Sequence, residues 1–275
     1  MNRLFVAYKP PFIGSNAFLH RLKKRYKVKK AGFSGTLDPF ACGVLIIAFG
    51  SYTKLFRFLK KTPKTYRATL WLGAKSPTLD IEKITSIQTL PKFDEKKVQA
   101  CLKSFQGTFR YTPPLFSAKK IGGKRAYELA HQGKSIELSQ VTSTIYDIRL
   151  IAYRHPFVTF EAEVSEGTYI RSLGEAIAKA LGVEGSLSYL ERLKEGAFIY
   201  EGEKPLNPVD YLATTPNKTT LSPDKIAMGR KIPLSSLLLQ DEGVYHLLFE
   251  EFFTIIEVKG GQVHYLLNRI PRSAS

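Results

Sequence analysis

The sequence predicts an α+β fold, with a mixed, mostly antiparallel sheet, flanking helices and a small β-rich module at the C-terminal end. Alternating apolar and polar residues over 66–72, 141–152 and 157–164 indicate strands with one buried face. Helical segments lie between the strands without the regular β-α-β rhythm that a parallel sheet needs. The length of 275 residues, 44% of them hydrophobic, suits one large globular domain with a small appendage.

Each element of the N-terminal third has a local signal. Two prolines end the apolar strand at 4–8, and Ser15 or Asn16 can cap the helix that follows. A loop rich in turn residues at 32–43 leads into the apolar run 44–49, which predicts a central strand.

The rest of the chain divides at a proline-rich segment. Asp94 can cap a helix, a second helix is expected over 168–181, and a further strand lies within 187–198. Residues 202–223 hold four prolines and are the best candidate for a linker. Three strand-like runs around a Gly-Gly turn follow and predict the β-rich module.

Positive charge is concentrated at the N-terminal end. The net charge is +17, and residues 1–79 hold 16 Lys and Arg against a single acid, Asp38. Such a block attracts phosphate and predicts a nucleic-acid partner, with a solvated basic surface as the alternative. Asp38 either begins a turn before Pro39 or takes part in chemistry.

The composition argues against several classes of protein. No apolar run approaches the roughly 20 residues of a membrane helix, and no leader pattern opens the chain, so a cytoplasmic protein without a membrane partner is expected. The cysteines, Cys42 and Cys101, form no C-x-x-C pair, and the five histidines are scattered. Neither a metal site nor a disulfide framework is therefore expected.

The stretch from Lys29 to Leu45 contains Gly35-Thr36-Leu37-Asp38-Pro39. It closely resembles the active-site motif of the TruB family, the bacterial tRNA pseudouridine-55 synthases. The resemblance continues from about residue 4 to residue 198, in the family's order. The other segments that carry it are Tyr8-Lys9-Pro10, Gly50-Ser51-Tyr52-Thr53-Lys54, Lys64-Thr65-Tyr66-Arg67, Pro113-Pro114-Leu115-Phe116-Ser117-Ala118, Gly167-Thr168-Tyr169-Ile170-Arg171-Ser172-Leu173, and Leu190 with Gly196-Ala197-Phe198.

The resemblance implies a fold and a function. It implies a pseudouridine-synthase catalytic domain over residues 1–215, a mobile RNA-binding loop at 111–135 and a short PUA-like RNA-binding module at 224–275. The implied activity is isomerisation of uridine 55 in the tRNA T-loop to pseudouridine, with an aspartate nucleophile and a flipped base. The implied partner is the T-arm of tRNA, and the implied state is a monomer.

Individual roles follow from the same resemblance. Asp38 matches the family's catalytic aspartate, and Arg171 matches the cation that holds it ionised. Tyr66 matches the platform for the flipped base, and Tyr169 and Leu190 match pocket walls. From the residues alone, Tyr66, Tyr169 and Leu190 are better explained as core residues. A phosphate contact is the alternative for Arg171, but its place in an otherwise apolar run favours burial.

Basic residues and one aromatic are expected to contact RNA. Phe33 stands where relatives carry a histidine that wedges the RNA loop open; packing beneath the 32–43 loop is its alternative. The expected phosphate contacts are Lys9, Lys54 and Lys119. Taken one at a time, none of them can be distinguished by sequence from a solvated surface charge. Tyr111, where the family commonly has glutamine, is a second departure from its pattern.

The implied reaction needs few chemical groups. Uridine becomes pseudouridine when the bond from ribose to N1 breaks and a bond to C5 forms, so nothing is oxidised or added. No redox cofactor, metal or nucleotide is expected, whereas a carboxylate nucleophile is. Two alternatives stay open: a non-catalytic tRNA-binding or folding module, and the same chemistry on another RNA. The lone acid in the basic block favours the enzyme.

Overall fold

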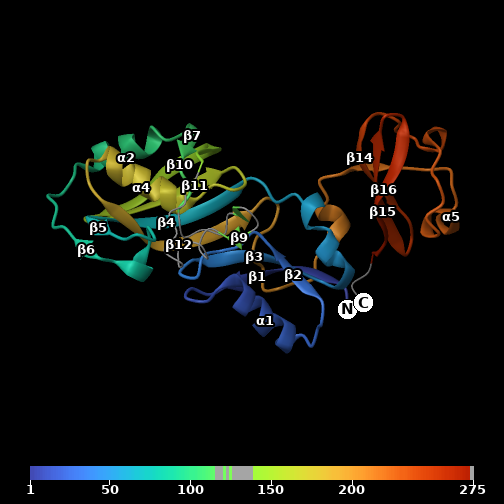
Figure 1. Ribbon diagram of the computed structural model, residues 1–275, viewed down its shortest axis with the longest axis horizontal. Helices are drawn as coiled ribbons and strands as arrows, with labels where there is room; N and C mark the ends of the chain where they lie inside the picture. The colour runs from blue at the N-terminus through green and yellow to red at the C-terminus, as the bar shows by residue number, and fades with distance from the viewer. Residues whose placement is uncertain (115–119, 122–123, 126–138, 273–275) are drawn as a thin grey trace.

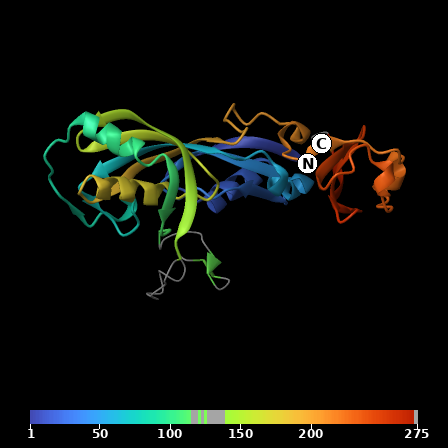
Figure 2. The same cartoon turned by 90° about the horizontal axis from the view of Figure 1, so that it is seen from above.

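A computed structural model describes residues 1–114, 120–121, 124–125 and 139–272. An eight-stranded sheet and a four-stranded sheet follow one another along the long axis of the molecule (Figures 1 and 2). Helices flank the larger sheet, and nearly all of its strand pairs are antiparallel. The predicted fold class, a mostly antiparallel α+β fold with a small β-rich C-terminal module, is confirmed. No helix in the described ranges is long and apolar enough to cross a membrane.

The larger sheet has the strand order β1-β3-β12-β4-β11-β10-β7, with β2 beside β3. Among its described strands, only β12 and β3 run parallel to each other. The strands are β1 (Arg3–Lys9), β2 (Ala31–Ser34), β3 (Cys42–Phe49), β4 (Lys64–Leu72), β7 (Gly107–Tyr111), β10 (Val141–Arg154), β11 (Phe157–Val164) and β12 (Gly185–Glu195). Two short hairpins, β5 (Ala74–Lys75) with β6 (Ser86–Ile87) and β8 (Lys120–Ile121) with β9 (Lys124–Arg125), lie outside it.

Helices cover the larger sheet in two places (Figure 1). The helix α1 (Ser15–Arg25) packs its buried apolar residues against β1 and β3. The helices α2 (Glu95–Lys103) and α4 (Ile170–Ala180) pack on β10, β4 and β12 around a second apolar core. The remaining helical turns are η1 (Gly50–Lys54), η2 (Phe56–Phe58), η3 (Ile81–Lys83), η4 (Pro208–Tyr211), α5 (Pro223–Ala227) and η5 (Leu234–Ser236).

Most expected elements lie where the sequence patterns indicate. In β4 every second residue is buried, as its alternation predicts, and all of β3 is buried, as its apolar run predicts. Asp94 caps α2 by accepting a hydrogen bond from Lys96 N at 2.8 Å. The loop expected at 32–43 begins instead as strand β2, because backbone pairing with β3 extends to Ser34.

The helix α1 begins differently from the expectation. Its N-cap is Gly14, so neither Ser15 nor Asn16 has that role. The buried Ser15 hydroxyl accepts a hydrogen bond from Leu37 N at 3.0 Å and donates one to Leu37 O at 2.9 Å. Ser15 therefore ties the start of α1 to the loop that carries Asp38.

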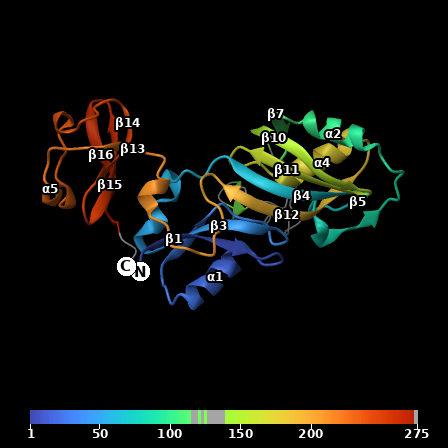
Figure 3. The same cartoon turned by 180° about the vertical axis from the view of Figure 1, so that it is seen from behind.

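The four-stranded sheet lies at one end of the larger sheet (Figure 3), and the two sheets share a core. Its strands are β13 (Thr215–Asn217), β14 (Gly243–Leu248), β15 (Phe252–Lys259) and β16 (Gln262–Pro271). Phe253, Ile255 and Ile270 pack in one buried cluster with residues of β1, β3 and η1. Strand β13 lies within the segment expected to be a linker, because it pairs in parallel with β14. The domain limits at 215 and 224 stay a prediction.

Candidate active site

A cavity of about 300 Å³ opens beside the loop that precedes β3. Four segments line it: the loop from Gly35 to Asp38, the start of β4, the turn leading into α4, and the end of β12. The lining residues are Gly35, Thr36, Leu37, Asp38, Lys64, Tyr66, Glu166, Gly167, Thr168, Tyr169, Ile170, Arg171, Leu190 and Arg192. Segments that are far apart in the chain therefore converge on one hollow, and it contains five residues singled out from the sequence.

Arg171 connects two carboxylates beside this cavity. Its guanidinium lies in the first turn of α4 and is only 3% exposed. Its Nε lies 2.8 Å from Asp38 Oδ2, and its Nη1 lies 3.4 Å from Asp80 Oδ2. Nη1 also donates to Thr78 O at 2.8 Å. Because this cation is buried against Asp38, it supplies a fixed counter-charge for that carboxylate.

Asp80 is a functional candidate that the sequence reasoning missed. It is buried, and it accepts hydrogen bonds from Thr78 Oγ1 at 2.6 Å and from Glu82 N at 3.0 Å. Burial raises the pKa of Asp80 above its usual value, although these hydrogen bonds and Arg171 oppose the increase. One sequence pattern could have pointed to Asp80, because it ends a second Thr-Leu-Asp tripeptide like the one that ends at Asp38.

Asp38 is less enclosed than its partners. Its side chain is 33% exposed, compared with 3% for Arg171 and 2% for Asp80. A carboxylate that faces a cavity while its cation is locked behind it can approach a bound molecule without losing its counter-charge. This arrangement suits a nucleophile that must stay ionised.

Lys9 does not occupy a surface position. It is fully buried, and its Nζ donates to Ile13 O at 2.7 Å, Pro10 O at 3.0 Å and Pro39 O at 3.2 Å. Burial lowers the pKa of Lys9 to about 8. The expectation that Lys9 contacts an RNA phosphate is therefore not supported, because its ammonium is enclosed by carbonyls of the chain itself. Its contact with Pro39 instead anchors the residue next to Asp38.

Two tyrosines and a leucine expected near the flipped base lie at the cavity. Tyr66, Tyr169 and Leu190 all line the cavity, and Tyr66 and Leu190 are buried. The hydroxyl of Tyr111 accepts a hydrogen bond from Tyr169 N at 3.0 Å and donates one to Gly167 O at 3.2 Å. Tyr111 thus holds the turn that presents Tyr169, a contact that sequence reasoning did not foresee.

Two expected RNA contacts, Phe33 and Lys54, lie outside the cavity lining. Phe33 is half-buried on β2, against the apolar cluster beneath α1, and is not among the residues that line the cavity. Lys54 is exposed on η1. Lys119 lies outside the described residues.

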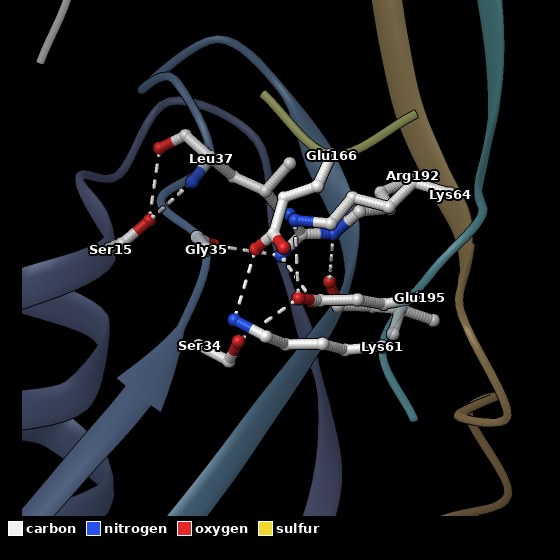
Figure 4. A network of polar contacts seen from close by, with 10 residues as sticks. Ser15, Ser34, Gly35, Leu37, Lys61, Lys64, Glu166, Arg192 and Glu195 are labelled. Atoms are coloured by element: carbon white, nitrogen blue, oxygen red, sulfur yellow. Dashed lines mark hydrogen bonds and ion pairs between the residues drawn. The ribbon is translucent and has the colours of Figure 1, made fainter. Parts of the chain in front are cut away.

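A group of buried charges lies under the same loop (Figure 4). Lys64 and Arg192 line the cavity, and Glu195 pairs with both of them. At the rim, Lys61 Nζ lies 3.0 Å from Glu166 Oε1. Sequence reasoning assigned no role to these five residues.

The family model described as TruB family pseudouridylate synthase (N terminal domain) matches residues 23–170. Curated relatives match nearly the whole chain. A tRNA pseudouridine synthase B from a Nitratiruptor species is 65% identical over 272 residues, which cover 99% of this chain and 99% of the relative. The protein of that name from a Sulfurovum species is 54% identical and covers 99% of this chain and 98% of the relative.

Solved structures share the fold at low identity. One chain from a crystal structure of a Cbf5-Nop10-Gar1 complex superposes with a TM-score of 0.67 at 20% identity, covering 98% of this chain and 84% of that chain. A chain from an H/ACA RNP bound to a substrate RNA containing 2'-deoxyuridine has a TM-score of 0.68 at 19% identity, covering 98% and 86%. At these identities the likeness concerns the fold alone.

Proposed function

Because this chain belongs to the TruB family of pseudouridylate synthases and forms pseudouridine in tRNA, we propose that its target is uridine 55 of the T-loop and that Asp38 is its nucleophile. The observation that carries the proposal is the ion pair between Asp38 and the buried Arg171, with 2.8 Å between Oδ2 and Nε. This pair faces a cavity that also contains Tyr66.

The reaction exchanges one bond for another within the same nucleoside. The bond from ribose C1′ to N1 breaks, a bond from C1′ to C5 forms, the C5 proton leaves and N1 gains a proton. Asp38 attacks either C1′ or the pyrimidine ring, holds that fragment while the base turns, and then departs. Since the carboxylate must be anionic at the first step, the buried Arg171 supports this role.

Tyr66 and Leu190 supply the faces between which a pyrimidine ring lies. The Tyr66 hydroxyl relays the proton that leaves C5. A base stacked in an RNA loop cannot reach a carboxylate in a cavity of about 300 Å³, so the target base is flipped out of its stack.

Surface charge supports recognition of the T-arm. The exposed basic side chains of the N-terminal third include Lys54 and most of the Lys and Arg residues from Arg21 to Lys30. These residues and Lys119 contact phosphates, and the module at 224–275 extends the RNA-binding surface. A monomeric state and a cytoplasmic location complete the proposal.

The first prediction tests the nucleophile with Asp38→Asn. The amide keeps the shape of the side chain but cannot attack carbon, so pseudouridine formation at position 55 should stop while tRNA affinity stays within about threefold. Single-turnover assays with base-resolution mapping, together with filter binding, measure both quantities. A variant that converts tRNA at a near-normal rate would exclude Asp38 as the nucleophile. Pseudouridine at another position would contradict the T-loop target.

A further inference from the structure

Glu195 is wholly buried beneath the loop that carries Asp38. Its Oε1 accepts a hydrogen bond from Ser34 Oγ at 3.1 Å and lies 3.3 Å from Lys64 Nζ. Its Oε2 forms an ion pair with Arg192 Nη2 at 3.2 Å (Figure 4). One carboxylate is therefore the shared counter-charge of two cations whose side chains are at most 7% exposed.

A bulge in β12 puts these groups on the cavity face. In a regular strand, residues three apart point to opposite faces, so Arg192 and Glu195 would be separated by the sheet. The pairing of β12 with β4 instead shifts between Arg192 and Lys194, so that Arg192 lies opposite Tyr66 and Glu195 opposite Lys64. Bulges of this kind redirect side chains next to active sites.

Arg192 holds both ends of the Asp38 loop. Its Nη2 donates to Gly35 O at 2.9 Å, and its Nε donates to Val44 O at 2.8 Å. Gly35 precedes Asp38 by three residues, and Val44 lies in β3, beyond the loop. The position of this guanidinium therefore bears on the whole loop.

The loop also rests directly on the charged cluster. Gly35 has φ +61°, and a Cβ there would lie 2.9 Å from Lys64 Nζ and 3.1 Å from Glu195 Oε1. No layer of side chains separates the turn from the charges, so a displacement of Arg192 or Lys64 would be passed to the backbone. Without Glu195, these two buried cations would lack their shared counter-charge and repel each other.

Resting on the proposed function, we propose that Glu195 is a positioning residue for Asp38. Its buried carboxylate holds Arg192 and Lys64 against the Gly35 turn. The conformation of that turn then determines the position of the Asp38 carboxylate in the cavity. A displacement of about 1 Å at a reacting group can cost about 100-fold in rate, so loss of Glu195 should act on the chemical step.

The test compares Glu195→Gln with Glu195→Asp and with a matched control. The control is Glu161→Gln, because Glu161 is also buried and also pairs with two cations, Arg67 at 2.6 Å and Arg149 at 2.5 Å. Glu161 pairs across the sheet with Arg67, the neighbour of Tyr66, so it lies on the face opposite the cavity.

At saturating enzyme, Glu195→Gln should lower the single-turnover rate constant by about 10- to 100-fold while tRNA affinity changes less than about threefold. Glu195→Asp, which keeps the charge, should recover part of the rate, and Glu161→Gln should stay within about twofold of the unmodified protein. All assays are run well below the melting temperature of each protein. If Glu195→Gln does not fold, Ser34→Ala removes one hydrogen bond to the same carboxylate and should slow the step by about two- to tenfold.

The inference is overturned if Glu195→Gln, or Ser34→Ala in its place, reacts at the unmodified rate. It is also overturned if Glu161→Gln loses as much rate, or if the whole loss is in tRNA binding. Failure of the proposed function is recognised separately. In that case Asp38→Asn stays active or the modified uridine is not position 55, whichever way the Glu195 series behaves.

Discussion

Asp38 and Lys9 belong to one loop region but differ in how far their charged groups are buried. Asp38 is partly exposed and lines the cavity, whereas Lys9 is enclosed and donates to three backbone carbonyls. A buried ammonium is costly unless its donors are satisfied, and three carbonyls satisfy this one. Lys9 therefore contributes to the geometry of the loop rather than to the RNA-binding surface.

The burial of Lys9 predicts a dependence of stability on pH. Its pKa falls from the usual 10.5 to about 8 in the folded protein. Between these values the unfolded chain binds the proton and the folded chain does not, so the stability contributed by this site rises with pH. Below the folded pKa both states are protonated, and the contribution becomes constant.

Urea unfolding of the unmodified protein and of Lys9→Met, from pH 6 to about pH 10, measures this contribution. The difference in unfolding free energy, unmodified minus variant, should be flat up to about pH 8 and should then rise in favour of the unmodified protein. A difference that stays flat or falls above pH 8 would show that folding does not lower the pKa of Lys9.

At the scale of single elements, strand pairing decides which side chains reach the cavity. The bulge in β12 brings Glu195 to the face of Arg192, and the short strand β2 directs Phe33 toward the cluster beneath α1. Because Phe33 packs there, outside the cavity lining, its position favours a packing role over the wedge expected from the resemblance.

Phe33→Ala distinguishes the two roles. If Phe33 packs, the variant should lose about 1–3 kcal/mol of stability. The relative loss of activity should then be equal for folded tRNA and for a short unstructured RNA with the same target sequence. A wedge would slow the folded tRNA selectively, because only there does a loop have to be opened. Single-turnover rates on both RNAs, with a melting curve, decide the matter; a selective loss on folded tRNA would restore the wedge.

The whole molecule is held together by an apolar core that crosses from one sheet to the other. Phe253, Ile255 and Ile270 bury their side chains with residues of β1 and β3, and the Tyr52 hydroxyl donates to Pro271 O at 2.8 Å. Because the four-stranded sheet contributes side chains to this shared core, it should influence the stability of the larger sheet as well as the affinity for RNA.

Two neighbouring isoleucines in β15 test this coupling. Both Ile255 and Ile256 are fully buried, but Ile255 belongs to the shared core and Ile256 to the module's own core. Ile255→Ala should remove about 2–5 kcal/mol and should lower the temperature at which pseudouridine formation is lost to heat. Ile256→Ala creates a comparable cavity away from the larger sheet, so heat inactivation should change less. Equal effects of the two substitutions, or no effect of Ile255→Ala, would contradict coupling through the shared core.

Short local patterns were enough to predict several features of the fold and of the site. Alternation predicted the buried face of β4, an unbroken apolar run predicted the buried strand β3, and Asp94 marked the start of α2. Asp38 stood out because a basic segment has no electrostatic use for an acid. Each of these signals depends on neighbours within a few positions, and such neighbours act before the chain is folded.

Local patterns could not predict which of these residues meet, because the contacts join distant segments. Asp80 reaches Arg171 across 91 positions of sequence, and Glu195 reaches Ser34 across 161. The second contact also requires a strand bulge that no local pattern revealed. Lys9 looked like a surface lysine because a residue's identity does not state how much of the fold will cover it. Register, bulges and burial arise from packing between distant segments, and that packing turned an isolated aspartate into a carboxylate held by a buried arginine at the edge of a cavity.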